Sequence, residues 1–154
     1  MVLGVQETDF DHMITVVTNL GGRMSKLKHF DPEATHLVTS MTSVRSEKLL
    51  ASMAAGLWVM HPHYLRESAK ALRFLPEDGF EWGNSSALPH THPVLVADQR
   101  AREMAKACHM WRVKAASHDF AFINFKAMLL GAPDKMAPFE RMIVAGRGEV
   151  VPFG

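Results

Sequence analysis

The sequence has a single cysteine, Cys108, among its 154 residues. One cysteine can form neither an internal disulfide nor a cysteine-rich zinc site, and it fits a reducing compartment, either cytosol or nucleus. No apolar run reaches the roughly 18 residues that a membrane span needs. The first ten residues, MVLGVQETDF, also lack the basic flank and the apolar stretch of a signal peptide, so secretion is not indicated.

A strong charge of either sign is missing as well. Seventeen Lys and Arg residues face sixteen Asp and Glu residues, which gives a net charge of +1. Such a balance does not by itself indicate nucleic acid as a partner. Residues 97–154 are slightly basic and residues 1–96 slightly acidic, which is weak support for a polyanionic partner. Hydrophobic residues make up 47% of the chain, enough for a packed core.

The motifs of common α/β enzymes are absent. The sequence contains no G-x-S-x-G, and no G-x-G-x-x-G after a predicted strand; LGGRM lacks the spacing of a phosphate-binding loop. His61 and His63 lie two positions apart, as do His90 and His92, but no third metal ligand has a recognisable spacing. We therefore predict no metal site and no cofactor, and we expect His61 to cap the helix that Pro62 opens.

Hydrophobic periodicity predicts an α/β fold with a largely parallel sheet and helices on both of its faces. Strands alternate with helices, and turn residues separate them. The Gly-Gly pair at 21–22 ends the first helix, Ser43 or Ser46 caps the second, and Gly56 ends it. The predicted strands cover residues 2–5, 23–27, 35–40 and 57–61, and the predicted helices cover 8–20, 46–56 and 62–72.

The remainder of the chain begins with a Pro-, Gly- and Ser-rich stretch at 77–93, which we interpret as a linker. A helix over 97–115 follows, with an apolar stripe that includes Cys108 as a buried thiol. A strand region at 120–130, a helix at 134–148 and the start of a strand then repeat the opening order of the chain. The strand region and the helix stripe would expose apolar surface unless something covers them, so we expect self-association.

Four segments together resemble a BRCT repeat: NLGGRM, FDPEATHLVTS, RSEKLLASMAAGLWVMHPHYL and FEWG. The landmarks are a Gly-Gly turn after the first helix, the THLV strand and a Trp on the strand after the second helix. The resemblance implies a three-layer fold with a central parallel four-stranded sheet. It also implies a BRCT repeat at 1–83, a linker with its helix at 84–118 and the N-terminal part of a second repeat at 119–154.

By the same resemblance, the protein is a nuclear scaffold without catalytic activity. Modules of this kind bind phosphorylated Ser/Thr motifs of partners in replication initiation and in the DNA-damage checkpoint, and they associate with DNA through such complexes. One alternative is a structural pairing or dimerisation module that binds no phosphate. An enzyme on an α/β sheet is less favoured, because no catalytic set can be placed in one cleft.

The resemblance assigns phosphate binding to Lys48, Arg45 and Gly4 of this chain. A helix N-terminus offers free N–H groups and partial positive charge, and a lysine in its first turn adds a full charge. Gly4 can donate its backbone N–H, but Leu3 stands where the family has a Ser or Thr hydroxyl. The alternative role for Lys48 is a solvated side chain paired with a nearby glutamate, either Glu47 or Glu33.

Overall fold

The computed structural model describes residues 2–6, 10–42, 45–86 and 98–152, with residues 2–6 as backbone only. The N-terminal unit is built on four parallel strands in the order β2-β1-β3-β4. The central pair is in register from Leu3 with His36 to Gln6 with Thr39. The predicted α/β class is therefore confirmed. The strands are β1 (Val2–Gln6), β2 (Arg23–Met24), β3 (His36–Thr39) and β4 (Trp58–Met60).

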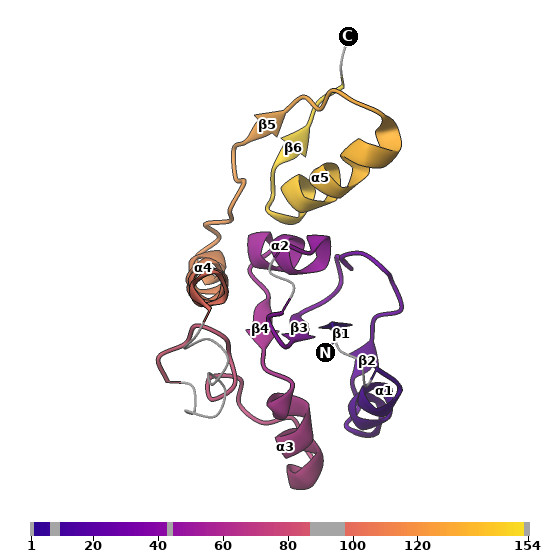
Figure 1. Ribbon diagram of the computed structural model, residues 1–154, viewed down its shortest axis with the longest axis vertical. Coiled ribbons are helices and arrows are strands. Elements are labelled where there is room, and N and C mark those ends of the chain that lie inside the picture. The colour runs from indigo at the N-terminus through magenta and orange to yellow at the C-terminus, as the bar shows by residue number, and fades with distance from the viewer. Residues whose placement is uncertain (1, 7–9, 43–44, 87–97, 153–154) are drawn as a thin grey trace.

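Helices lie on both faces of this sheet. Helices α1 (Phe10–Asn19) and α3 (His63–Ala71) cover one face, and α2 (Glu47–Ala54) lies on the other (Figure 1). Met13 and Val17 of α1 are buried against Val38, Met60 and Tyr64, as expected for apolar residues at helical spacing. Gly21, at φ +86°, provides the predicted left-handed stop.

Strand β2 is shorter than the predicted strand over 23–27. The hydroxyl of Ser25 accepts a hydrogen bond from the Leu27 N–H at 3.3 Å, so this amide has a local partner in place of a strand partner. The chain beyond Met24 therefore leaves the sheet and forms a loop that returns to β3. This loop passes close to the N-terminal end of α2 and becomes part of the candidate site.

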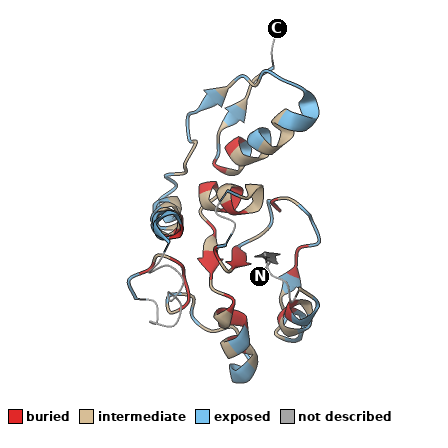
Figure 2. Cartoon of the chain, in the orientation of Figure 1, coloured by how far each residue is buried: buried red, intermediate tan, exposed pale blue. Residues whose placement is uncertain are grey.

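Helix α2 begins and ends where the sequence indicates. Of the two predicted caps, Ser46 holds the position, and its hydroxyl accepts from the Leu49 N–H at 3.2 Å. Gly56, at φ +71°, follows the helix end. Leu49 faces the sheet, and Ala51 packs under Phe30 of the loop, so α2 is buried on two sides (Figure 2).

Helix α4 (Gln99–Ala116) packs against the N-terminal unit. Asp98 caps it through the N–H groups of Arg100 and Ala101. Its stripe of small residues is buried against the N-terminal unit, so the chain itself covers the stripe that we expected to be exposed unless something covered it. The first residue of the predicted helix, at position 97, lies outside the described residues. The buried stripe consists of Ala101, Ala105 and Cys108, in contact with Leu37, Leu49, Val59 and Trp82.

The close approach of α4 depends on glycine. At Gly83, which has φ +80°, an added Cβ would lie 2.1 Å from the carbonyl oxygen of Ala105. At Gly56 an added Cβ would lie 2.2 Å from the Cβ of Ala115. Both glycines therefore combine a backbone conformation that favours glycine with a contact that no side chain would allow.

The segment after α3 is not the linker that we predicted for 77–93. Phe80, Glu81 and Trp82 are buried, and Glu81 bridges to Met60 beside the sheet. The Trp82 indole N–H donates to the carbonyl oxygen of Thr39 at 2.7 Å, so the tryptophan has its polar atom satisfied inside the core. Positions 87–93 of the predicted linker lie outside the described residues.

The C-terminal unit consists of β5 (Lys126–Ala127), α5 (Pro133–Ala145) and β6 (Glu149–Val150). Its two strands are parallel, and α5 lies against α2 (Figure 1). The strand region predicted over 120–130 is wrong in length: the N–H of Ile123 donates to Phe120 and that of Phe125 to Phe122, and Asn124 has φ +63°. These contacts form turns before the short strand begins.

The described residues contain neither a helix that could cross a membrane nor a cluster of metal ligands. No helix among them has both the length and the apolar character required to cross a membrane. Within the same residues, no group of three or more His, Cys, Asp or Glu side chains is arranged to hold a metal ion. The His61 ring nitrogen accepts from the His63 N–H at 3.0 Å, at the start of α3, but the residue at the cap position is Pro62 and not His61 as predicted.

Candidate functional site

Lys48 is the second residue of α2, directly after Glu47 and the capping Ser46. It therefore lies in the first turn, where backbone N–H groups lack partners within the helix and the helix dipole is positive. Its ammonium donates a hydrogen bond to the carbonyl oxygen of Leu27, at 3.0 Å, in the loop after β2. The cation is thus directed across the end of the sheet toward this loop.

The setting of Lys48 is partly buried and contains one carboxylate. Burial lowers the pKa of Lys48, and the charge of Asp31 opposes this shift. For Asp31, burial acts to raise the pKa, but hydrogen bonds from the Glu33 amide and the Ser25 hydroxyl, with the charges of Arg23 and Lys48, lower it overall. The charge of each group favours the ionised form of the other, so the two attract each other.

Gly4 lies in the middle of β1, paired with Leu37 of β3. In a parallel sheet all strands end at the same edge. The loop after β2 and the N-terminus of α2 both lie at this edge, where β1 ends at Gln6. Gly4 is two residues inside it, about 7 Å along the strand. The described contacts of Lys48 are with the loop residues and not with Gly4.

Arg45 faces another direction. It lines a cavity of about 390 Å³ between α2 and α4, together with Leu50, Met53 and Met104. Lys48, by contrast, contacts the loop between β2 and β3. The structure therefore gives Arg45 and Lys48 different neighbours on the two sides of the first turn of α2.

Lys48 does not form the alternative ion pair with Glu47 or Glu33, because both glutamates bind arginines. The guanidinium of Arg141 binds Glu47 through two hydrogen bonds, of 2.5 and 3.1 Å, and so joins α5 to α2. Glu33 pairs with Arg23 at 2.8 Å. Both glutamates have other cations as partners, and the acidic neighbour of Lys48 is Asp31.

Chemically, the first turn of α2 offers a cation, a helix terminus and a backbone carbonyl that occupies one N–H of the ammonium. A phosphate oxygen could accept from the remaining N–H groups of Lys48 or displace the Leu27 carbonyl. The negative charge of Asp31 would oppose the phosphate. The site is thus suited to an anion, with an affinity limited by its own acidic neighbour.

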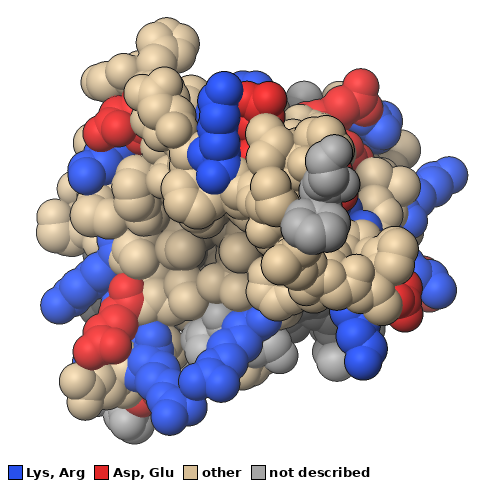
Figure 3. Space-filling view, turned by 90° about the horizontal axis from the view of Figure 1, so that it is seen from above, with Lys and Arg blue, Asp and Glu red and all other residues tan. Residues whose placement is uncertain are grey.

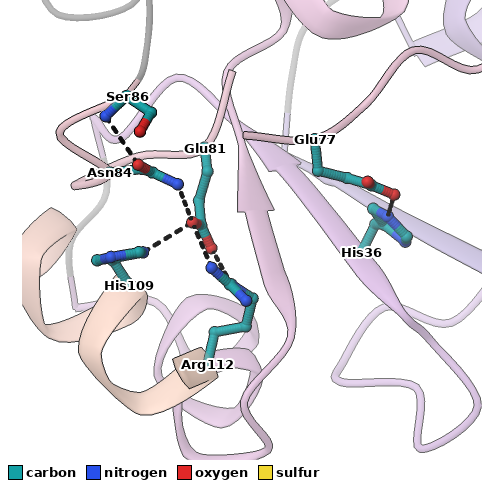
Figure 4. Close-up of polar contacts among 7 residues, drawn as sticks. All are labelled: His36, Glu77, Glu81, Asn84, Ser86, His109 and Arg112. Carbon is teal, nitrogen blue, oxygen red and sulfur yellow. Dashed lines mark hydrogen bonds and ion pairs between the residues drawn. The ribbon is translucent and has the colours of Figure 1, made fainter. Parts of the chain in front are cut away.

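A polar cluster that was not predicted from the sequence surrounds Glu81, whose carboxylate is buried (Figure 4). It accepts from His109 Nδ1 at 2.7 Å, from Asn84 at 3.0 Å and from both Arg112 Nε and Nη2, the latter at 3.0 Å. Because a carboxylate only accepts, His109 carries its proton on Nδ1. In the sequence, Glu81 stands between Phe80 and Trp82, and nothing in this local pattern indicates that its carboxylate is buried.

Arg112 also connects the Glu81 cluster, through the ring of Trp58, to the buried side chain of His36. The guanidinium carbon of Arg112 lies 3.6 Å from the centre of the Trp58 ring, and His36 stacks near the same ring. Burial lowers the pKa of His36, while the hydrogen bond and the charge of Glu77 oppose this shift.

Burial also raises the pKa of Cys108 to about 12, so the thiol stays protonated, in agreement with the predicted buried thiol.

Several curated proteins are similar to this chain in sequence. The chain is 32% identical over 120 residues, or 76% of its length, to the SMC5-SMC6 complex localization factor protein 1 of Mus musculus and to that of Homo sapiens. It is 30% identical over 71 residues, or 46% of its length, to a BRCT domain-containing protein of Arabidopsis thaliana. It spans about a tenth of the first two relatives and 5% of the third. No family model matches the chain.

Among solved structures, the chain resembles the fifth and sixth BRCT domains of S. pombe Brc1, with a TM-score of 0.61 and 15% identity. The match covers 99% of this chain and 66% of the other. The fold is therefore that of BRCT domains.

Proposed function

We propose that the chain binds a phosphorylated Ser or Thr of a partner protein at the N-terminal end of α2. Lys48 supplies the main positive charge, Arg45 contacts the flanking residues, and Gly4 offers a backbone N–H. The observation that carries this proposal is the position of the Lys48 ammonium. It lies in the first turn of a capped helix, at the edge where β1 ends, and it is partly withdrawn from water.

The charge distribution supports a negatively charged partner. Seen from the side of the C-terminal unit, Lys and Arg side chains outnumber Asp and Glu around a hollow of uncharged atoms (Figure 3). Long basic side chains around a hollow of uncharged residues suit a peptide that carries a phosphate and uncharged residues beside it. Selectivity for the residues after the phosphate would come from the cavity between α2 and α4 that Arg45 lines.

The proposed setting is the nucleus. The relatives in mouse and human are described as localization factors of the SMC5-SMC6 complex. We propose that this chain acts in the same context, as a scaffold without catalysis in replication and checkpoint signalling, and that it reaches DNA through its complex. The sequence also resembles the C-terminal tandem BRCT repeats of the DNA topoisomerase II-binding protein, with residues 119–154 as part of a second repeat.

A second candidate is a structural pairing module that binds no phosphate. Eight of the ten exposed large hydrophobic side chains in the described residues lie between Met110 and Val144. Such a concentration is typical of a surface that another protein covers. This function would place the contact on α4 and the C-terminal unit, whereas phosphate recognition would use the first turn of α2.

The experiment that tests phosphate recognition is a calorimetric titration. A peptide from a checkpoint protein is compared in phosphorylated and unphosphorylated form, on the wild type, on Lys48→Ala and on the control Lys70→Ala. Lys70 is an exposed lysine of α3 paired with Glu67. We expect the wild type to prefer the phosphorylated form, and Lys48→Ala to bind it about ten- to a hundredfold more weakly.

The control should bind like the wild type, because its cation is on the other face of the sheet. Equal affinity of the wild type for both peptides would remove the mechanism. Equal discrimination by the wild type and Lys48→Ala would show that another residue holds the phosphate.

A further inference from the structure

A second cavity lies where three distant segments of the chain meet. It has a volume of about 490 Å³ and is formed by the loop at 29–34, the C-terminal end of α2 and the C-terminal half of α5. Most of its wall is apolar, and part of the wall is already in the core cluster under α2. The main apolar residues are Phe30, Pro32, Ala34, Leu57, Val144 and Ala145.

The size and the lining of this cavity match a site for a bulky side chain. Small-molecule sites commonly have volumes of about 300–1,000 Å³ and a mostly apolar wall, so this cavity has room for a bulky side chain. Val144 is 53% exposed at this wall, although the residue before it in α5, Ile143, is buried. An apolar group that entered the cavity would cover Val144 and remove apolar surface from water.

The charge at the rim decides which partner fits. Two arginines and one glutamate line the cavity. The Arg141 charge is already used, because its guanidinium is bound to Glu47 through two hydrogen bonds. The hydrogen bonds to Glu47 raise the pKa of Arg141, and the negative charge of Glu140 beside it acts in the same direction.

Arg147 is the cation that remains. Its guanidinium carbon lies 4.9 Å from the centre of the Phe120 ring, and among the described residues it forms no ion pair with a carboxylate. Its backbone has φ +70°, in a turn closed by the bond from the Gly148 N–H to the carbonyl of Ile143. The turn and the ring hold the Arg147 cation beside the apolar cavity.

We propose that this cavity binds an acidic segment of a partner protein. One bulky apolar side chain of the segment occupies the cavity, and an adjacent carboxylate pairs with Arg147. The site does not rest on phosphate recognition, because Ala55 at its wall is seven residues after Lys48, about 10 Å along α2. The cavity also lies on the side of α2 away from the Arg45 cavity.

The test uses the full 154-residue chain and three fluorescein-labelled, unphosphorylated peptides in a fluorescence polarisation titration. DELFDE carries both features, KRLFKR reverses the charge, and DEGGDE lacks the apolar side chains. We expect DELFDE to bind with a dissociation constant below about 1 mM and at least tenfold more tightly than either other peptide.

Two variants locate the binding. Arg147→Asn removes the charge with a residue that tolerates the left-handed backbone, and Ala34→Leu narrows the cavity. Each should weaken DELFDE binding at least fivefold. Arg73→Asn, at an exposed arginine after α3, is the matched control and should have no effect.

Equal binding of DELFDE by the wild type and Arg147→Asn would overturn the proposal. Absence of binding up to 1 mM would overturn it too, as would equal binding of KRLFKR. If Ala34→Leu instead abolished self-association of the chain while no peptide bound, the occupant would be a second copy of the chain and the proposal would be wrong. If Ala34→Leu fails to fold, the affinity of Arg147→Asn for DELFDE alone tests whether the cavity binds the peptide.

Discussion

The guanidinium of Arg112 contacts two partners at once: its carbon is 3.6 Å from the centre of the Trp58 ring, and its nitrogens bind the buried carboxylate of Glu81. Arg112 belongs to α4, whereas Trp58 belongs to β4 and Glu81 to the segment after α3. The ion pair therefore fixes the helix between the two units onto the N-terminal sheet.

Replacing Arg112 by Met should destabilise the chain strongly. The substitution leaves the Glu81 charge buried with only His109 and Asn84 as donors, and breaking such a pair costs about 3–5 kcal/mol. Urea unfolding followed by circular dichroism measures this. Lys106→Met, at an exposed position of the same helix, should change the free energy of unfolding by less than about 0.5 kcal/mol. Similar losses for the two variants would show that Arg112 contributes only as a surface residue.

Removing the charge of Asp31 should strengthen phosphopeptide binding. Asp31→Asn removes the carboxylate that now attracts the Lys48 ammonium and would repel a phosphate. We expect roughly a threefold gain in affinity, with a loss of about 1 kcal/mol in stability because the Glu33 N–H loses a charged acceptor. Calorimetry with the phosphorylated peptide measures the gain, and Glu33→Gln is the control. A weaker affinity for Asp31→Asn than for this control would show that the carboxylate supports the site.

The chain should self-associate through the C-terminal unit. Phe125 is 48% exposed and Leu130 is 65% exposed, on a segment beside a two-stranded sheet. The double variant Phe125→Ser and Leu130→Ser should shift the sedimentation coefficient toward that of a monomer. Leu72, 84% exposed at the end of α3, provides the control Leu72→Ser, which should leave the distribution unchanged. A wild type that is monomeric at about 100 µM and binds no hydrophobic dye would contradict this expectation.

Stability should fall as the pH decreases below about 6.5, and His36 should account for part of this loss. Burial lowers the pKa of His36, so the unfolded state takes up its proton first. The contribution of His36 is therefore fully present above the unfolded pKa, and it is lost as the pH falls toward the lower pKa of the folded state. The slope from one such group is at most about 1.4 kcal/mol per pH unit.

The variant His36→Phe keeps a ring beside Trp58 and removes the titration. Its free energy of unfolding between pH 7.5 and 5.0 should decrease less than that of the wild type. Equal decreases in the two proteins would assign the pH dependence to other groups.

The N-terminal half of the fold was predictable from local patterns. The cap at Ser46, the stop at Gly21 and the alternation of short strands with helices follow from the residues themselves. Strand lengths were less predictable, because local hydrogen bonds such as that of the Ser25 hydroxyl end the sheet early. The turns at 120–125 replaced a predicted strand for the same reason.

Contacts between distant segments could not be read from the sequence. Glu81 looks like an ordinary surface residue, and only the folded chain brings His109 and Arg112 to it from α4. Likewise, Arg141 is 94 residues from Glu47, and no periodicity links them. The position of Lys48 in the first turn of α2 was predictable, but its neighbours Leu27 and Asp31 depend on the path of the loop after β2.

The most direct test of phosphate recognition is an NMR spectrum of the lysine side-chain ammonium groups. The signal of Lys48 is assigned by its absence in Lys48→Arg. On addition of the phosphorylated peptide we predict that this signal shifts, while the signal of Lys70 stays in place and the unphosphorylated peptide shifts neither. A bound phosphopeptide that leaves the Lys48 signal unchanged would contradict the account.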